Sequence, residues 1–280
     1  MISYIGGKSK ISKWIIPFIP KDIETYVEPF GGMYWVFFKM VLKDYPNLNT
    51  VVYNDFNRLN ANLFNSVKDY DTLHQHMSTY PTQVMGEDID PKEYEECFKR
   101  CQSEVFNPEF VSPIYGNYDI ACKYLYTLTH IFSGGKPGSS KFIYYHGKYR
   151  DKFLVFMDKL KKKEWTEHFD KITNVENLDA CDVINKYDNE KAFFYIDPPY
   201  YSTENYYSNH DFGLNDHERL ANCMKNMKGK FALSYYEFPQ LSEWFPKDQY
   251  RWETKEFPKS AAASKDKKQN MGVELLIMNY

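Results

Sequence analysis

Two short apolar runs near the N-terminus predict strands, at residues 25–28 and 50–54. The segment between them opens with Pro29-Phe30-Gly31-Gly32, which predicts a turn leading into a helix over residues 33–42. Strand, glycine turn, helix and strand in this order are typical of a parallel, doubly wound sheet. The first part of the chain therefore predicts an α/β fold.

The same pattern of strands and helices returns after residue 172. It predicts a strand that ends at Ile196, a helix over 216–227, a strand over 230–234 and a closing strand over 273–279. The two ends of the chain are therefore expected to build one sheet.

The middle of the chain lacks strands linked by glycine turns. Residues 57–170 are predicted to be mostly helical, with the clearest helix over 117–132 and a loop or hairpin rich in Gly, Tyr and Lys over 133–150. The sequence thus predicts a sheet domain, made of residues 1–56 and 171–280, that is split by a helical insertion.

Composition narrows the class of protein. The chain has 280 residues, of which 43% are hydrophobic and 26% charged, as in ordinary soluble globular proteins. A net charge of −3 argues against a wholly basic nucleic-acid-binding surface but leaves room for a local basic face. The 5 cysteines show no CxxC pair and no zinc spacing, so we expect no metal and a reducing compartment. No signal peptide precedes the domain, and the apolar run 14–20 is too short to span a bilayer, so we expect a cytoplasmic protein without membrane contact.

The most informative motif is Asp197-Pro198-Pro199-Tyr200, directly after the apolar run 192–196. The aspartate supplies a carboxylate acceptor, and the prolines lack N–H groups, so the local backbone offers carbonyl acceptors. The tyrosine ring offers a face on which a base can stack. These residue types suit the binding of a planar amino group beside a reactive methyl donor. The alternative is a strand that simply ends at a Pro-Pro turn.

A second set of residues indicates a nucleoside cofactor without a diphosphate. The turn over 28–32 lacks the GxGxxG and GxxxxGK[ST] patterns, which makes NAD and ATP poor candidates. Asp55 ends the next strand, where an acid can accept hydrogen bonds from ribose hydroxyls, and we therefore expect S-adenosylmethionine. The alternative for Asp55 is a helix N-cap ahead of Asn57. Lys8 is a candidate partner for the methionine carboxylate of the cofactor, or else a solvated lysine.

Together these motifs resemble a family. Tyr4-Ile5-Gly6-Gly7-Lys8, Glu28-Pro29-Phe30-Gly31-Gly32, Asn54-Asp55 and Asp197-Pro198-Pro199-Tyr200 occur in that order, and the closing segment 273–280 fits as well. The chain resembles the Dam-like (class alpha) DNA adenine methyltransferases. This resemblance implies a Rossmann-like methyltransferase sheet with a helical target-recognition insertion over 57–170. It also implies S-adenosylmethionine as the methyl donor and double-stranded DNA as the partner. The sequence does not reveal the oligomeric state, for which we favour a monomer.

The resemblance also implies roles for individual residues. The acceptor would be the exocyclic N6 of an adenine flipped out of the duplex, because a paired base cannot reach such a pocket. Asn177-Leu178 would lie against the cofactor adenine. The implied catalytic residues are Asp197, Pro198 and Tyr200. The implied cofactor-binding residues are Tyr4, Lys8, Phe30, Gly31, Gly32, Asp55 and Asp197.

A basic and aromatic segment is the candidate DNA-binding surface. Residues 133–163 carry nine Lys and Arg side chains against two Asp, a net charge of +7. A solvated lysine face is the preferred interpretation of Lys161-Lys162-Lys163. For the loop over 136–152 we expect contact with DNA phosphates and bases. The expected DNA-binding residues are Lys136, Lys141, Tyr144, Lys148 and Arg150.

The loop departs from the pattern of relatives that read GATC. Those members carry an Arg/Asn-containing stretch before a Gly-Xaa-Phe-Asn hairpin, whereas this chain has Lys141-Phe142-Ile143-Tyr144-Tyr145 at the hairpin. Arginine is the commonest reader of guanine, and Arg150 is the only arginine between residues 101 and 218. The sequence therefore does not predict GATC specificity. A second basic stretch over 255–268 is expected to be flexible, either closing over DNA or forming a plain surface loop.

Two other functions stay open at this point. The first is a methyltransferase that acts on RNA or on a protein glutamine, although such enzymes usually carry Asn in place of Asp197 and lack the insertion. The second is a DNA-binding protein that keeps the fold without catalysis. The sequence reveals neither the recognition sequence nor a partner endonuclease, nor whether the chain comes from a phage or a cell.

Overall fold

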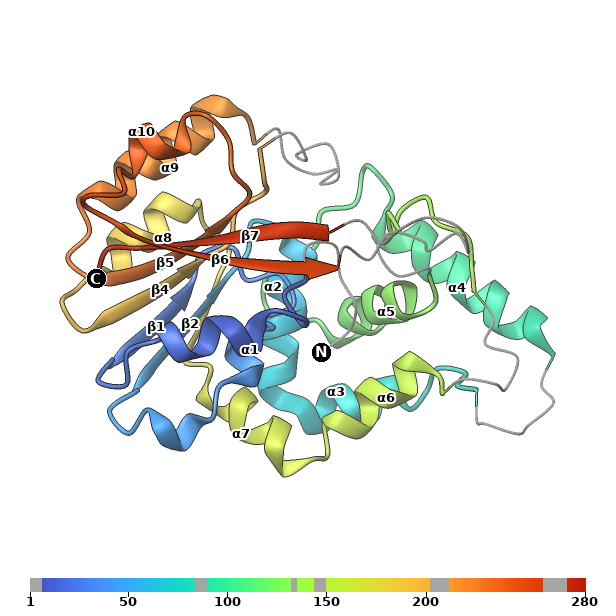
Figure 1. Cartoon of the computed structure of the whole chain (residues 1–280). Helices are drawn as coiled ribbons and strands as arrows, with labels where there is room; N and C mark the ends of the chain where they lie inside the picture. Colours follow the sequence, from blue (N-terminus) through green and yellow to red (C-terminus); the bar gives the residue numbers. More distant parts are fainter. Residues whose placement is uncertain (1–6, 84–89, 132–134, 144–149, 202–211, 259–270) are drawn as a thin grey trace.

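The computed structural model describes residues 7–83, 90–131, 135–143, 150–201, 212–258 and 271–280 (Figure 1). In these residues a 7-stranded sheet has the order β3-β2-β1-β4-β5-β7-β6. β7 runs antiparallel to β5 and β6, and the other neighbours pair in parallel. The strands are β1 (Thr25–Glu28), β2 (Thr50–Asn54), β3 (Asn174–Glu176), β4 (Ala192–Ile196), β5 (Lys230–Tyr235), β6 (Arg251–Pro258) and β7 (Met271–Met278). The expected α/β class is confirmed, with both ends of the chain in one sheet.

Helices cover both faces of the sheet because successive strand residues point to opposite sides. Val27, Val52 and Phe194 face a core shared with α8 (Ala180–Tyr187), α9 (Leu214–Lys225) and α10 (Leu241–Trp244). Their neighbours in sequence face a second core, which α1 (Ser12–Ile15) and α2 (Arg58–Ser66) help to cover. Figure 1 shows α8, α9 and α10 on one side of the strands and α1 and α7 on the other.

The segment between β2 and β3 is mostly helical, as expected. Figure 1 shows α3 to α6 on the right, beside the carboxyl ends of the parallel strands. Its longer helices begin with polar caps: Asn117 accepts a hydrogen bond from the N–H of Ile120 at the start of α5. The helices after α2 are α3 (Tyr70–Met77), α4 (Pro91–Val105), α5 (Tyr118–Thr129), α6 (Lys152–Lys159) and α7 (Lys163–Lys171).

Among its described residues, the insertion shares its buried core with the sheet. One buried cluster contains sheet residues such as Tyr53 together with side chains of α2, α4, α5, α6 and α7. The ring of Tyr53 stacks on Phe64 of α2 with centroids 3.9 Å apart, and Phe38 packs edge-on against Phe169 of α7 at 5.4 Å. The sheet and the insertion are therefore held together by continuous apolar packing.

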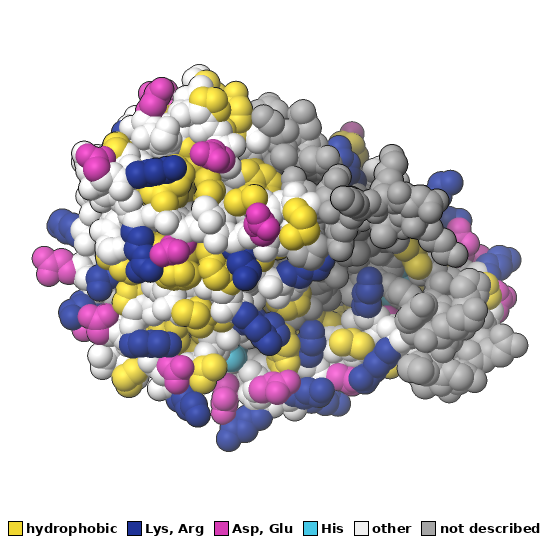
Figure 2. Space-filling model, viewed as in Figure 1, with side chains coloured by type: hydrophobic (Ala, Val, Ile, Leu, Met, Phe, Trp, Pro, Cys, Tyr) yellow, Lys and Arg dark blue, Asp and Glu magenta, His cyan; other side chains and the backbone are white. Residues whose placement is uncertain are grey.

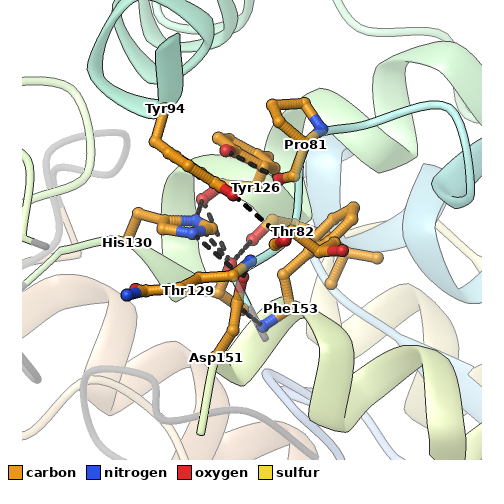
Figure 3. A network of polar contacts seen from close by, with 10 residues as sticks. Pro81, Thr82, Tyr94, Tyr126, Thr129, His130, Asp151 and Phe153 are labelled. Atoms are coloured by element: carbon orange, nitrogen blue, oxygen red, sulfur yellow. Dashed lines mark hydrogen bonds and ion pairs between the residues drawn. The ribbon is translucent and has the colours of Figure 1, made fainter. Parts of the chain in front are cut away.

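A buried polar cluster holds the two ends of the segment between α5 and α6 (Figure 3). His130 follows α5, and its Nδ1 lies 2.9 Å from the carbonyl oxygen of Tyr126 while its Nε2 lies 3.6 Å from the Asp151 carboxylate. The same carboxylate accepts the N–H of Phe153 at 2.7 Å and so caps α6. The N–H of Ile143 donates to the carbonyl of His130 at 2.8 Å. These contacts anchor the base of the segment in which DNA contact was predicted.

The predicted helix over residues 33–42 is wrong. The chain there forms two short 3-10 turns, Phe37–Lys39 and Leu42–Asp44. Gly32 and Tyr34 have φ values of 49° and 55°, in the left-handed region that interrupts a right-handed helix. The N–H of Phe37 donates to the Glu28 carboxylate at 3.2 Å instead of to a helix carbonyl. Burial of the large aromatic side chains decides the backbone path here.

Two predicted loops are described only in part. Residues 135–143 contain no strand, and the rest of the expected hairpin over 133–150, apart from Arg150, lies outside the described residues. In the stretch expected to be flexible, Lys255 to Pro258 form the end of strand β6, which is a correction, and 259–270 lie outside the description. β6 is regular because its backbone pairs with β7 from Arg251 through to Pro258.

Within the described ranges, no helix combines the length and the apolar character that a membrane crossing needs. The same residues contain no cluster of three or more His, Cys, Asp or Glu side chains able to hold a metal ion. Cys97 and Cys101, one helical turn apart on α4, are buried free thiols. Figure 2 shows Lys and Arg side chains interspersed with Asp and Glu over the described surface of one face.

Candidate active site

The candidate site lies where the order of the sheet reverses. From β1 the chain continues to β2 and β3 on one side, and it later returns to β4 on the other side of β1. In open α/β sheets, ligands bind in the crevice at the carboxyl ends of the strands beside such a point. A cavity of about 360 Å³ lies there and is lined by residues that follow β1, β2 and β4, including Phe30, Asp55 and Asp197. This volume is within the range of small-molecule sites, roughly 300–1,000 Å³.

The glycine turn after β1 is tied to the end of β2. The N–H of Gly31 donates to the carbonyl of Asn54 at 2.7 Å, and the N–H of Gly32 donates to the Asp55 carboxylate at 2.9 Å. A Cβ atom on Gly31 would lie 2.4 Å from Cε2 of Tyr53 and 2.9 Å from the carbonyl oxygen of Asn54. Only glycine therefore fits at position 31, and this fit brings the turn against the wall of the cavity.

Asp55 is held at the cavity by several donors. Its carboxylate accepts the N–H of Asn57 at 2.7 Å and the side-chain amide of Asn60 at 2.9 Å. The N-cap of α2 is Asn57, whose side chain accepts the N–H of Leu59, so the capping alternative for Asp55 is wrong. The hydroxyl of Tyr124 on α5 donates to Asn60 at 2.8 Å and connects the insertion to this acid.

Lys8 lies between two carboxylates. Its Nζ is 2.9 Å from Oδ1 of Asp197 and 3.1 Å from Oε1 of Glu274 on β7. The side chains of Lys8, Asp197 and Glu274 are 10%, 16% and 1% exposed. Burial raises the pKa of Asp197 to about 6, Lys8 opposes this rise and Glu274 adds to it. For Lys8, burial works to lower the pKa, but the two carboxylates outweigh it and the pKa is raised.

Tyr200 belongs to the same cluster. Its hydroxyl donates to Glu274, and Lys8 lies over its ring at 4.4 Å from the centroid as well as donating to the hydroxyl. The ring packs against Tyr236 at 4.4 Å between centroids. Tyr200 and Pro198 are buried, and Pro199 is the proline that lines the cavity. The structure therefore puts Tyr200 behind Asp197, in the network that supports it.

Most of the other predicted cofactor residues line the cavity. Phe30, Gly31, Gly32 and Leu178 are on its wall, and Phe30 packs edge-on against Phe212 at 5.8 Å. The side chain of Asn177 donates to the carbonyls of Asp55 and Phe56 at 2.7 and 2.9 Å. Tyr4 lies outside the described residues.

Of the five predicted DNA-binding residues, the structure describes three: Lys136, Lys141 and Arg150. Lys136 lines the cavity from the insertion side, although its side chain is largely exposed. Lys141 is exposed on the same segment, and Arg150 forms an ion pair with Asp158 of α6. Tyr144 and Lys148 lie outside the described residues.

The prediction from sequence missed three buried polar residues of this region: Glu28, Ser234 and Glu274. Glu28 lines the cavity and accepts the Tyr26 hydroxyl at 2.6 Å, and burial raises its pKa well above the usual range. Ser234 donates to Glu274. The sequence did contain a signal for Glu274, which is a single acid inside the apolar run Val273-Glu274-Leu275-Leu276. Because an unpaired buried charge is costly, such an acid indicates a buried partner.

Comparisons with known proteins agree with this geometry. A family model described as D12 class N6 adenine-specific DNA methyltransferase matches residues 4–258. The Modification methylase StsI of Streptococcus sanguinis is 24% identical over 253 residues, which cover 83% of this chain and 34% of that protein. Type II methyltransferase M.CviBI of Paramecium bursaria Chlorella virus NC1A is 24% identical, covering 83% of this chain and 81% of its own length. Type II methyltransferase M.FokI of Planomicrobium okeanokoites is 23% identical, covering 78% and 31%. The chain thus spans about a third of the length of two of these relatives.

Proposed function

The chain belongs to the D12 class of N6 adenine-specific DNA methyltransferases, and from this premise we propose its reaction. The protein transfers a methyl group from S-adenosylmethionine to N6 of an adenine that is flipped out of double-stranded DNA. The observation that carries this proposal is the position of Asp197, which follows β4, has a side chain only 16% exposed and lines the same cavity as the glycine turn after β1.

The cavity residues fit the proposed methyl donor. Gly31 and Gly32 would allow close approach of the methionine moiety, and Asp55, which lines the same cavity after β2, would accept hydrogen bonds from the ribose hydroxyls. Leu178 supplies an apolar contact for the adenine ring. When bound, S-adenosylmethionine supplies an electrophilic methyl group on a sulfonium. No conventional diphosphate-binding pattern is needed for such a ligand.

Asp197 and the backbone carbonyl of Pro198 are the proposed acceptors for the target amino group. The lone pair of this amino nitrogen is delocalised into the adenine ring, and two acceptors draw it toward tetrahedral geometry. The Asp197 carboxylate also stabilises the positive charge that develops on the nitrogen. Transfer of the methyl group would break its bond to sulfur and leave S-adenosylhomocysteine. The cationic methylamino group that forms is acidic and releases its proton to water, so a strong general base is unnecessary. Positioning of the reactants contributes on the order of 7–11 kcal/mol in well-aligned reactions.

Base flipping is the step that brings the adenine to Asp197. Extruding a base costs on the order of a few kcal/mol. The sequence motif suggested Tyr200 as the ring that stacks on the flipped base. Its burial and its hydrogen bond to Glu274 instead favour a role in supporting Lys8 and Asp197. Cavity-lining rings such as Phe30 and Trp35 are better placed for contact with a base or with the cofactor.

The test is methyl transfer from radiolabelled S-adenosylmethionine to duplex DNA, RNA and a protein substrate. We expect label in duplex DNA, and digestion of that DNA should yield N6-methyladenine. Label in RNA or protein alone would favour the first alternative activity. Binding of DNA without transfer to any substrate would favour a relative that has lost catalysis.

The rate should depend on the ionisation of Asp197. Its pKa lies at about 6, mainly because of burial. Since the carboxylate form accepts the amino group, the rate of methyl transfer should fall as the pH decreases through about 6, by about tenfold for each further pH unit. Single-turnover rates measured across this range check the prediction, and a rate independent of pH there would contradict the role of Asp197.

We further propose that the segment carrying Lys136 and Lys141 contacts the DNA backbone. Lys141→Gln should lower the slope of log affinity against log salt concentration by about 0.9, because one phosphate contact is lost. Lys163→Gln is the matched control, since Lys163 is 88% exposed on α7 and was expected to belong to a solvated face. Filter-binding or anisotropy titrations at several salt concentrations give the slopes. Equal slopes for both variants and the parent protein would contradict the contact.

The wider setting follows from the proposed substrate. Relatives named as modification methylases and type II methyltransferases support a role in DNA modification, with or without a partner endonuclease. We propose action as a monomer, in the cytoplasm of a prokaryote or of a phage-infected host, where the DNA substrate is accessible.

A further inference from the structure

Glu274 is a buried acid that the proposed reaction does not use directly. It lies on β7, and its side chain is 1% exposed. Three donors converge on its Oε1: the ammonium of Lys8 at 3.1 Å, the hydroxyl of Tyr200 and the hydroxyl of Ser234. A buried carboxylate is costly unless its hydrogen bonds are made. These three contacts therefore hold Glu274 in a defined geometry.

Lys8 connects this set to the cavity, and the Tyr200 hydroxyl also acts on Asp197. Lys8 bonds to Glu274 on one side and to Oδ1 of Asp197 at 2.9 Å on the other. Asp197 and Lys8 line the cavity, whereas Glu274, Ser234 and Tyr200 are not among its lining residues. Glu274 is therefore placed to act on the cavity through Lys8.

We propose that Glu274 is a positioning residue for methyl transfer: it fixes Lys8, and Lys8 in turn fixes the carboxylate of Asp197 against the target amino group. This inference rests on the proposed function. The charge of Glu274 also keeps Lys8 from pairing with Asp197 alone, so that the Asp197 carboxylate remains a strong acceptor. Tyr200 and Ser234 hold Glu274 itself and complete the support.

The electrostatic consequence has a definite sign at Asp197. Charged and titratable groups surround this carboxyl on several elements. Removing the charge of one of them shifts the pKa of Asp197 in a direction set by the sign of that charge. Loss of the Glu274 charge should lower the pKa of Asp197, whereas loss of the Lys8 charge should raise it. The groups concerned are Lys8, Glu28 of β1, Tyr195 of β4, Tyr200, Tyr236 and Glu274 of β7.

The experiment compares Glu274→Gln, Lys8→Gln and the double variant in the full chain. Glutamine keeps an oxygen for the donors at position 274, so the variant is expected to fold, and thermal denaturation checks this. Carbon-13 NMR of labelled aspartate reports the titration of Asp197 without added ligand, with Asp197→Asn used to assign its signal. The midpoint should move to lower pH in Glu274→Gln and to higher pH in Lys8→Gln, and it should return toward the parent value in the double variant.

Turnover provides the second measurement. Glu274→Gln should lower kcat by ~10- to 100-fold, the equivalent of about one hydrogen bond to a charged group, with the KM for S-adenosylmethionine and for DNA unchanged within about twofold. In the pH–rate profile of Glu274→Gln, the fall in rate on the acid side should move to lower pH, in the same direction as the NMR midpoint. Glu253→Gln is the matched control, because Glu253 lies on the neighbouring strand β6 in an exposed pair with Arg251 and should change neither value.

The outcomes separate this inference from the proposed function. If the parent protein transfers no methyl group to DNA, the proposed function fails, whatever the NMR titration gives. If the parent protein is active and Glu274→Gln folds but keeps both its kcat and its Asp197 midpoint, Glu274 is not a positioning residue. A fall in thermal stability alone, with kcat and midpoint unchanged, would also overturn the inference.

Discussion

Asp197→Ala is expected to lower the rate of methyl transfer by at least about 10²- to 10³-fold, the loss typical of removing one group that stabilises a transition state. The methyl side chain cannot accept the target amino group or stabilise the charge that develops on it. Cofactor binding should be kept in part, because Asp55 and the glycine turn do not depend on Asp197 for their contacts. Single-turnover transfer and calorimetric titration with S-adenosylmethionine measure the two effects.

The variant should also remain folded, which makes the measurement informative. Lys8 keeps Glu274 as a counter-ion at 3.1 Å when Asp197 is removed, so no unpaired buried cation is created. Asp248→Asn is a suitable control, because this acid is exposed in the segment between α10 and β6. Near-normal turnover by folded Asp197→Ala would exclude the mechanism proposed for this residue.

Gly31→Ala is expected to damage both stability and cofactor binding. The added Cβ would lie 2.4 and 2.7 Å from ring carbons of Tyr53 and 2.9 Å from the backbone oxygen of Asn54. The Tyr53 ring cannot move away easily, because it is fully buried and stacks on Phe64. Overpacking of this kind costs about 1–3 kcal/mol in the free energy of unfolding. Displacement of the turn should also weaken S-adenosylmethionine binding by at least roughly tenfold, the effect of about 1.4 kcal/mol.

Gly213→Ala is the matched control for this substitution. A Cβ at position 213 would have no heavy atom within 4 Å, and Gly213 is the N-cap of α9, away from the tight turn. Because alanine is a poorer N-cap than glycine, replacement of Gly213 should cost at most about 1 kcal/mol in the free energy of unfolding and leave S-adenosylmethionine binding unchanged. Chemical denaturation and calorimetry apply to both variants. Equal free energies of unfolding and equal affinities for S-adenosylmethionine in the two variants would mean that the tight fit at Gly31 contributes to neither.

The sequence predicted strands and helices correctly where the local hydrophobic pattern matches the burial that the fold provides. Thr25–Glu28 and Thr50–Asn54 are strands at the predicted bounds because short apolar runs between turn residues have few other ways to bury themselves. The motif at 197–200 could be located at the end of a strand for the same reason. Helix α5 was predictable from its periodicity and from the cap at Asn117.

The predictions from sequence failed where contacts between distant parts of the chain determine the local structure. Nothing local in residues 33–42 reveals that Tyr34 adopts a left-handed backbone so that its ring can pack on Phe37 and Phe64. Glu274 could be seen as an acid in an apolar strand, but its partner Lys8 is at the other end of the chain. The buried position of Tyr200 likewise depends on β7, which the motif itself does not contain.

The continuous packing of sheet and insertion has a consequence for engineering new sequence specificity. An exchange of residues 57–170 between relatives would cut through the stack of Tyr53 on Phe64 and the contact of Phe38 with Phe169. A chimera joined at those bounds would inherit mismatched aromatic surfaces and should express poorly. Grafts confined to the segment between α5 and α6, whose base is tied by His130 and Asp151, leave these two aromatic contacts intact. New specificities are therefore better sought by loop libraries than by domain exchange.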